Sequence, residues 1–147
     1  RFRRSNVGIV FQSFHLVPTM TAVENVALPL ELAGAGLAFE KAEAMLEEVG
    51  LSHRLTHYPA QMSGGEQQRT ALARALVANP PVLFADEPTG NLDQNTGRQI
   101  MDLILRLAEE RGTTVLLITH DRVLADRCAR VETMQDGQLL SARNKAS

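Results

Sequence analysis

The sequence predicts an α/β protein with a mainly parallel sheet and a largely helical segment inserted into that sheet. Three short apolar runs, at 6–11, 82–85 and 114–119, are typical of buried strands. Between the last two lie residues 95–110, in which apolar side chains recur at helical spacing. Strands that alternate with helices favour a parallel sheet. Residues 17–79 separate the first two strands and carry mostly helical patterns.

Two helices are expected early in the inserted segment. Thr21 and Glu24 have the spacing of a capping box, in which each side chain accepts a backbone N–H from the other residue. The helix that follows is expected to be interrupted near Pro29, because proline removes a helical hydrogen bond. A second helix is expected over 39–49, where apolar residues share one face, and Gly50 closes it.

A second capping box and a hairpin complete the predicted elements. Residues 63–66 (Ser-Gly-Gly-Glu) form the box, and the helix that they begin is expected to run to about residue 78. Near the end of the chain, residues 131–135 and 138–140 are expected to pair as the strands of a hairpin around the turn Asp136-Gly137.

Composition excludes several classes of protein. The chain has 147 residues, which suits one domain, and 44% of them are hydrophobic, as in a folded globular protein. Its formal net charge of -2 gives no electrostatic basis for a nucleic-acid partner. No apolar run approaches the roughly 18 residues of a membrane-spanning helix. A single cysteine, with histidines that lack ligand-like spacing, excludes a thiolate metal cage.

Polar residues follow the ends of all three predicted strands. Gln12 follows the first, Asp86 and Glu87 the second, and His120 the third. Open α/β sheets bind ligands at the carboxyl ends of their strands. Asp86 suits a nucleotide-bound Mg²⁺, a hard cation that prefers oxygen ligands, and Glu87 could polarise an attacking water. Each residue alone is more often a cap, an ion-pair partner or a surface residue, and only their combination favours nucleotide hydrolysis.

Ser63, Gly64 and Gly65 open a helix and could bind an anion. Unpaired backbone N–H groups and the positive end of the helix dipole favour negative charge at this point, and the hydroxyl adds a donor. From these three residues alone, an ordinary capped helix is the better-supported interpretation.

Five motifs in one order resemble those of ABC transporter ATP-binding proteins. The segment 61–75, Gln-Met-Ser-Gly-Gly-Glu-Gln-Gln-Arg-Thr-Ala-Leu-Ala-Arg-Ala, is similar to the signature motif and its helix. The segment 82–89, Val-Leu-Phe-Ala-Asp-Glu-Pro-Thr, is similar to Walker B with its catalytic glutamate. Gly90-Asn91-Leu92-Asp93 resembles the D-loop, and Thr119-His120-Asp121 resembles the switch histidine. Phe11-Gln12 resembles the Q-loop.

The resemblance covers nearly all of the chain and implies a P-loop NTPase fold of ABC type. It implies one partial ABC ATPase domain over 1–147. The RecA-like core would be 1–16 and 80–147, truncated at its N-terminal side, and the inserted helical subdomain would be 17–79.

The resemblance also implies ATP and Mg²⁺ as ligands. Glu87 would be the general base for water, and His120 would contact the γ-phosphate. Gln12 would sense Mg²⁺ and the γ-phosphate, Asp86 would hold Mg²⁺, and Asp93 would communicate across a dimer. The signature residues would bind the ATP held by a second ATPase subunit, expected to be an identical copy: Ser63, Gly64, Gly65 and Glu66.

The sequence departs from the family pattern in three places. Met62 and Glu66 stand where Leu and Gln are usual. Glu66 adds a carboxylate that could weaken ATP binding, although it also completes the capping box. No Gly-x-x-x-x-Gly-Lys-Ser/Thr loop occurs, and that loop normally cradles the phosphates. We therefore expect a C-terminal fragment of a longer ATPase, inactive alone and with part of its core uncovered.

Residues 10–26 and 86–93 narrow the resemblance to the lipoprotein-release and macrolide-export type of bacterial ABC ATPase. The expected function is ATP hydrolysis that powers export or membrane extraction of a substrate through transmembrane permease subunits. The expected location is the cytoplasmic face of the bacterial inner membrane, with no nucleic-acid partner. Two alternatives stay open: an ABC ATPase that acts outside transport, on nucleic acid or ribosomes, and a catalytically dead interaction module, since the phosphate loop is absent.

Overall fold

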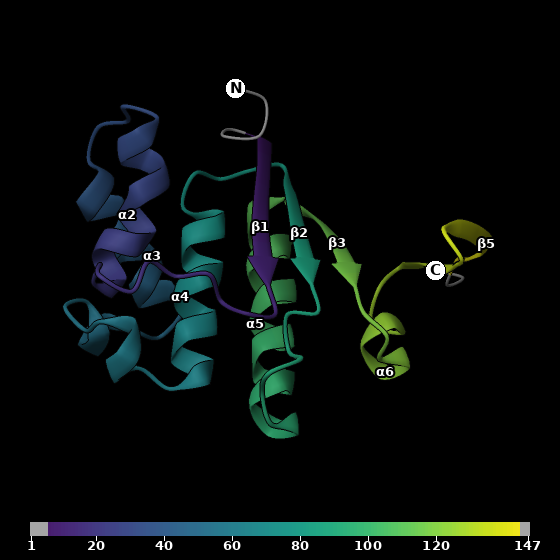
Figure 1. Cartoon of the computed structure of the whole chain (residues 1–147). Coiled ribbons are helices and arrows are strands. Elements are labelled where there is room, and N and C mark those ends of the chain that lie inside the picture. The colour runs from purple at the N-terminus through teal and green to yellow at the C-terminus, as the bar shows by residue number, and fades with distance from the viewer. Residues whose placement is uncertain (1–5, 145–147) are drawn as a thin grey trace.

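The computed structural model describes residues 6–144, and a parallel sheet of three strands lies at its centre (Figure 1). The strands are adjacent in the order β1 (Val7–Phe11), β2 (Val82–Asp86) and β3 (Thr114–Ile118). β1 and β2 are hydrogen-bonded neighbours, although the whole helical segment separates them in sequence. The predicted α/β fold with a mainly parallel sheet is confirmed.

Helix α5 (Gln94–Arg111) covers one face of the sheet and lies behind the strands in Figure 1. Its apolar stripe is fully buried at Ile100, Ile104 and Leu107, as the helical spacing predicts. The helix ends at Gly112, whose φ of 63° is the left-handed conformation that glycine adopts without strain. The β2–α5–β3 unit is thus the alternation that makes the sheet parallel.

The opposite face of the sheet is open over the described residues, because Figure 1 shows no helix in front of the strands. Leu116 and Ile118 point apolar side chains from β3, and each exposes 49% of its surface. Apolar sheet faces are normally covered by a second layer. This uncovered face agrees with the expectation that part of the core lacks a cover.

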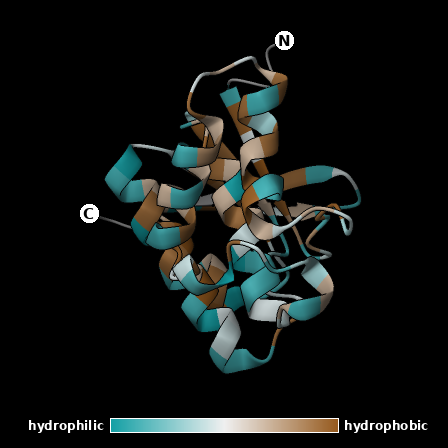
Figure 2. Ribbon diagram, turned by 90° about the vertical axis from the view of Figure 1, so that its left-hand side faces the viewer, coloured by the Kyte–Doolittle hydropathy of each residue, from teal (hydrophilic) through white to brown (hydrophobic). Residues whose placement is uncertain are grey.

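The segment between β1 and β2 forms a layer of helices beside the sheet. Its elements are α2 (Ala22–Leu32), α3 (Ala38–Glu48), the short 3-10 helices η1 (Ser52–Arg54) and η2 (Pro59–Gln61), and α4 (Gly64–Leu76). They share one buried cluster that includes Val26, Leu46 and Leu72. Figure 2, which views the molecule from this side, shows hydrophobic and hydrophilic residues mixed along the helices, as amphipathic helices require. α4 also contacts β1 and α5, and so connects this layer to the sheet.

The expected interruption at Pro29 is wrong, because α2 continues through Pro29 to Leu32. Pro29 lies near the end of the helix, so the loss of one hydrogen bond affects only the last turns. Val26 and Ala27 are fully buried and Leu30 is nearly so. Their packing against the core stabilises the helix by more than the proline destabilises it.

The two predicted capping boxes differ. At α4 both bonds form: Ser63 Oγ accepts the N–H of Glu66, and Glu66 Oε2 accepts the N–H of Ser63, each at 3.2 Å. At α2 the Thr21 hydroxyl accepts the N–H of Glu24 at 3.4 Å but donates to Glu24 Oε1 at 2.8 Å. The carboxylate there bonds the hydroxyl in place of the backbone, so only half of the predicted box is present.

The last part of the described chain is a short helix followed by a hairpin. α6 (Arg122–Ala125) precedes β4 (Arg130–Gln135) and β5 (Gln138–Asn144), which pair antiparallel in a sheet of their own. The turn residues Asp136 and Gly137 have φ of 50° and 77°, the two left-handed positions of a type I′ turn. The predicted hairpin is confirmed.

Within residues 6–144, none of the helices combines the length and the apolar character that crossing a membrane requires.

Candidate functional site

The carboxyl ends of the three parallel strands meet at one edge of the sheet, called here the carboxyl edge. The register pairs Phe11 with Asp86 and Asp86 with Ile118. Gln12 directly follows β1 and Glu87 directly follows β2, so the two residues leave the sheet side by side. Parallel pairing alone produces this convergence, since strands that run in one direction end at one edge.

Glu87 is fixed to the segment after β3 by both backbone and side chain. Its N–H donates to the carbonyl of Ile118 at 2.8 Å, and its φ of 45° is left-handed, which is uncommon outside glycine. Oε1 accepts the N–H of His120 at 2.9 Å and lies 2.7 Å from its Nδ1, and Oε2 accepts the Thr119 hydroxyl at 3.3 Å. The carboxylate therefore has one defined position, and β2 and β3 are tied together at the carboxyl edge.

The Glu87 carboxylate raises the pKa of His120 above its ordinary value of 6.5, first through the side-chain hydrogen bond and second through Coulomb attraction. Desolvation lowers this pKa, and the charge of Asp121 raises it. The protonated imidazole is therefore favoured next to the carboxylate. A cation at this position could stabilise negative charge that develops on a phosphate.

Gln12 is joined to the loop after β2 by a reciprocal pair of bonds with Asn91. The Gln12 amide nitrogen donates to Asn91 Oδ1 at 3.2 Å, and Asn91 Nδ2 donates to the carbonyl of Gln12 at 3.1 Å. Gly90 lies against the Gln12 side chain so closely that a Cβ there would collide with it. The bond uses the amide nitrogen of Gln12, whereas a cation would take the amide oxygen.

Asp86 ends β2 with an exposed side chain, at the centre of the carboxyl edge. No three His, Cys, Asp or Glu side chains form a metal-binding cluster among the residues that the structure describes. Mg²⁺ in nucleotide sites takes one or two protein oxygens and fills its other positions with phosphate oxygens and water. The Asp86 carboxylate and the Gln12 amide oxygen are donors of that kind, so these residues fit Mg²⁺ that arrives with a nucleotide.

The predicted anion site opens α4, with Ser63 as N-cap and Gly64 and Gly65 in the first turn. This turn packs against the loop that leads into α5. A Cβ on Gly65 would lie 2.8 Å from Cγ2 of Thr96, and one on Gly64 would lie 3.3 Å from Cδ2 of Leu92. Glycine at 65 is therefore required by the close approach of two helix N-termini. The backbone N–H groups of a helix N-terminus such as this one favour an anion.

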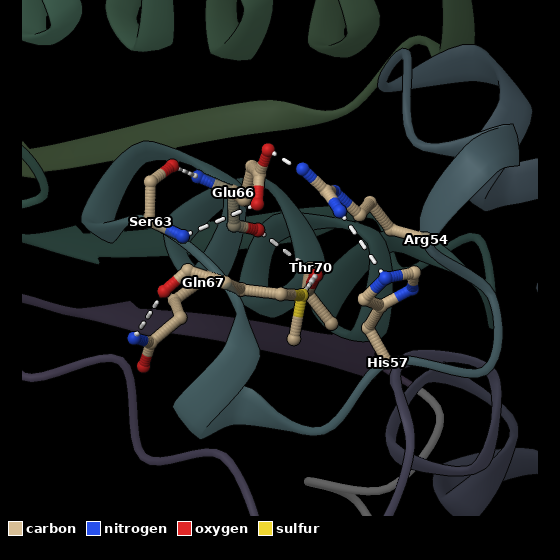
Figure 3. Close-up of polar contacts among 7 residues, drawn as sticks. Arg54, His57, Ser63, Glu66, Gln67 and Thr70 are labelled. Carbon is tan, nitrogen blue, oxygen red and sulfur yellow. Dashed lines mark hydrogen bonds and ion pairs between the residues drawn. The ribbon is translucent and has the colours of Figure 1, made fainter.

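Glu66 is ion-paired, which changes the expectation that its charge weakens ATP binding. Its Oε1 accepts a hydrogen bond from Arg54 Nε at 3.3 Å, while Oε2 is bonded to the N–H of Ser63 (Figure 3). The carboxylate does not stand alone next to the anion site. Arg54 was missed from the sequence because no spacing rule connects η1 to the start of α4.

Asp93 has a structural task as the N-cap of α5. Its Oδ2 accepts the N–H of Thr96 at 3.1 Å, and the hydrogen bonds from Thr96 lower the pKa of Asp93 below its ordinary value. The ionised carboxylate suits the positive end of the helix dipole. The role of Asp93 in communication across a dimer stays a prediction.

The sequence motifs give no role to Gln68, a polar residue that is fully buried in α4. Its amide nitrogen donates to the carbonyl of Phe11 at 3.0 Å and to the carbonyl of Pro88. These carbonyls adjoin Gln12 and Glu87, so Gln68 ties the helix of the anion site to both loops of the carboxyl edge. The sequence could have indicated its burial, because Gln68 lies four residues before Leu72 and so shares the buried face of α4.

The known proteins that resemble this chain are ATP-binding proteins of transport systems. The profile of the family described as ABC transporter matches residues 1–90. The chain is 55% identical to the uncharacterized ABC transporter ATP-binding protein YbbA of Escherichia coli (strain K12), over 95% of this chain and 62% of that relative. It is 50% identical to the lipoprotein-releasing system ATP-binding protein LolD of Legionella pneumophila (strain Lens), again over 95% and 62%. It is 48% identical to the macrolide export ATP-binding/permease protein MacB of Syntrophobacter fumaroxidans, over 92% and 19%.

A solved structure has the same fold. The dimeric structure of a post-hydrolysis state of the ATP-binding cassette MJ0796 bound to ADP and Pi superposes with a TM-score of 0.85 and 42% sequence identity. The match covers 97% of this chain and 64% of that chain. The chain thus spans 62% of the length of the YbbA and LolD relatives.

Proposed function

This chain belongs to the ABC transporter family, and we propose that its protein hydrolyses ATP to move a substrate through a membrane partner. The observation that carries the proposal is at the carboxyl edge, where His120 and Thr119 hold Glu87 directly after Asp86. A fixed carboxylate next to a metal-binding one can activate water for attack on a nucleoside triphosphate. The descriptions of the relatives as ATP-binding proteins support the same activity.

In the proposed reaction Glu87 accepts a proton from the water that attacks the γ-phosphate in line. His120 and Thr119 now bond both oxygens of that carboxylate, so one oxygen must exchange its partner for water. Protonated His120 would then bond a γ-phosphate oxygen and stabilise the charge that develops there. Mg²⁺, held by Asp86 and the amide oxygen of Gln12, would supply charge neutralisation of the phosphates.

The signature residues would act on the ATP of a second copy. Ser63, Gly64 and Gly65 present a helix N-terminus that suits a phosphate. Asp93 begins α5 next to these glycines, so it would lie at the same interface between copies. Two solved structures of one cassette of this fold, MJ0796, are described as dimeric, which supports a homodimer with two ATPs between its subunits.

The helical layer would carry the contact with the membrane partner. We place the division between a RecA-like core, 1–16 and 80–147, and a helical subdomain, 17–79. The subdomain would bind transmembrane permease subunits, and the protein would sit at the cytoplasmic face of a bacterial inner membrane. The names of the LolD and MacB relatives support export or membrane extraction of a lipoprotein-like or macrolide-like substrate.

Phosphate release from ATP and Mg²⁺ tests the proposal, with the full-length protein and the 147-residue chain assayed side by side. The full-length protein is expected to hydrolyse ATP, with a specific activity that rises with protein concentration as dimers form. The 147-residue chain alone is expected to be inactive, because it has no phosphate-binding loop. A full-length protein without turnover would favour an interaction module, and turnover by the chain alone would refute its expected inactivity.

A further inference from the structure

The Glu66 carboxylate holds the start of the anion site in place. Oε2 accepts the N–H of Ser63 at 3.2 Å, and Ser63 Oγ accepts the N–H of Glu66 at the same distance. These two bonds fix the geometry of the turn that carries the glycines. They also place a negative charge at the end of α4 that a phosphate would occupy, and two anions compete for one positive helix end.

Arg54, which lies outside α4, forms an ion pair with that carboxylate. Its Nε donates to Glu66 Oε1 at 3.3 Å, and the two side chains are 31% and 22% exposed. Solvent therefore screens the pair less than it screens an ion pair on the open surface. With Arg54 present, the carboxylate and the guanidinium sum to no net charge beside Ser63.

His57 keeps the guanidinium in position. Its Nε2 lies 3.1 Å from Arg54 Nη1, and a dashed line marks this contact in Figure 3. A guanidinium can only donate, so Nε2 is the acceptor and the ring proton is on Nδ1. Backbone bonds add to this, since the N–H of His57 donates to the carbonyl of Arg54 at 3.0 Å and the N–H of Arg54 to that of Leu51 at 2.9 Å. The His57 ring and these backbone bonds thus hold Arg54 in a position from which its side chain reaches Glu66.

We propose that Arg54 is a positioning residue for nucleotide binding in trans: it neutralises Glu66 and holds that carboxylate on the N–H of Ser63, so that the anion site accepts phosphate. This inference rests on the proposed function. It explains how the site tolerates Glu where the family pattern has Gln. Neutralisation depends on the charge of Glu66, whereas the contact of Arg54 with His57 does not.

The test compares Arg54→Met in two backgrounds of the full-length protein, with Glu66 and with Glu66→Gln. In the Glu66 background, Arg54→Met is expected to raise the KM for ATP about tenfold, equivalent to ~1.4 kcal/mol, and to leave kcat within about twofold. In the Glu66→Gln background the same change is expected to alter KM by less than about twofold, because no charge is left to neutralise. Arg54→Lys is expected to restore most of the affinity, since it retains the charge.

A matched control removes an arginine ion pair elsewhere. Arg106 pairs with Glu110 at 3.3 Å on the exposed side of α5, and Arg106→Met is expected to leave KM and kcat unchanged. Equal effects of Arg54→Met in both backgrounds would show a role that does not depend on the charge of Glu66 and would overturn the inference. No effect in either background would also overturn it. An inactive wild-type protein would instead refute the proposed function, so the two failures are distinguishable.

Discussion

Glu87→Gln in the full-length protein is expected to slow ATP hydrolysis by about 10²- to 10⁴-fold, the usual contribution of a general base. The amide has the size of the carboxylate and can still accept the N–H of His120, which Oε1 accepts at 2.9 Å in the structure. It cannot take a proton from water. ATP binding does not need that transfer, so dimers with bound ATP are expected to accumulate.

Phosphate release measures the rate, and light scattering with ATP and Mg²⁺ measures the dimer. Unchanged hydrolysis would show that Glu87 is not the general base. Loss of the dimer together with hydrolysis would show that Glu87 acts in binding and not in the chemical step.

The same variant also tests the contact between Glu87 and His120, through the pH titration of His120 followed by NMR. In the wild type the midpoint is expected above 6.5, because the hydrogen bond and charge of Glu87 raise the pKa of His120. A neutral amide at this position should return the midpoint toward 6.5. The raised pKa means that the pair stabilises the fold fully at pH below 6.5 and that this contribution is lost as pH rises through the raised value. A midpoint that does not differ between the two proteins would contradict the pairing.

Ser63→Arg is expected to abolish ATP-driven dimerisation, because the long side chain would fill the space that the γ-phosphate of the partner's ATP needs. The substitution also removes the cap oxygen that accepts the N–H of Glu66, which destabilises a helix by about 1 kcal/mol. Light scattering with ATP in the Glu87→Gln background measures the dimer without interference from turnover. Normal dimers in this variant would refute binding in trans.

Ser63→Ala separates the two effects of that change. It removes the same cap oxygen without adding bulk, so its thermal unfolding is expected to resemble that of Ser63→Arg. Dimers should still form in Ser63→Ala at high ATP concentration, since the backbone N–H groups of the helix end remain. Equal loss of dimers in both variants would assign the effect to the cap and not to the occupied phosphate space.

The elements that the sequence predicted well have local signals. The apolar stripe of α5 and the capping box of α4 depend on residues within a turn or two of one another, and both are present. Pro29 was misread for the opposite reason. Whether a proline ends a helix depends on what the surrounding residues bury, and the burial of Val26 and Leu30 by α3 and α4 is a tertiary effect.

The candidate site was predictable to the same extent. That Gln12, Asp86, Glu87 and His120 approach one edge follows from parallel strands, which their patterns indicated. The bond between Glu87 and His120 depends on the left-handed turn at Glu87, which no residue preference predicts. Contacts such as Arg54 with Glu66 and Gln68 with two carbonyls join distant segments. Their partners depend on the path of the chain and not on spacing.

The proposal that each ATP lies between Glu87 of one copy and Ser63 of the other is tested most directly with two full-length copies joined in one polypeptide. One fusion carries Glu87→Gln in the first copy and Ser63→Arg in the second, and the other carries both substitutions in the same copy. If each site combines Glu87 of one copy with Ser63 of the other, only the first fusion retains an intact site. The first fusion is therefore expected to hydrolyse ATP, and the second is not. The reverse result, with activity only when both substitutions share a copy, would contradict ATP sites shared between copies, because Glu87 and Ser63 would then serve the same subunit's ATP.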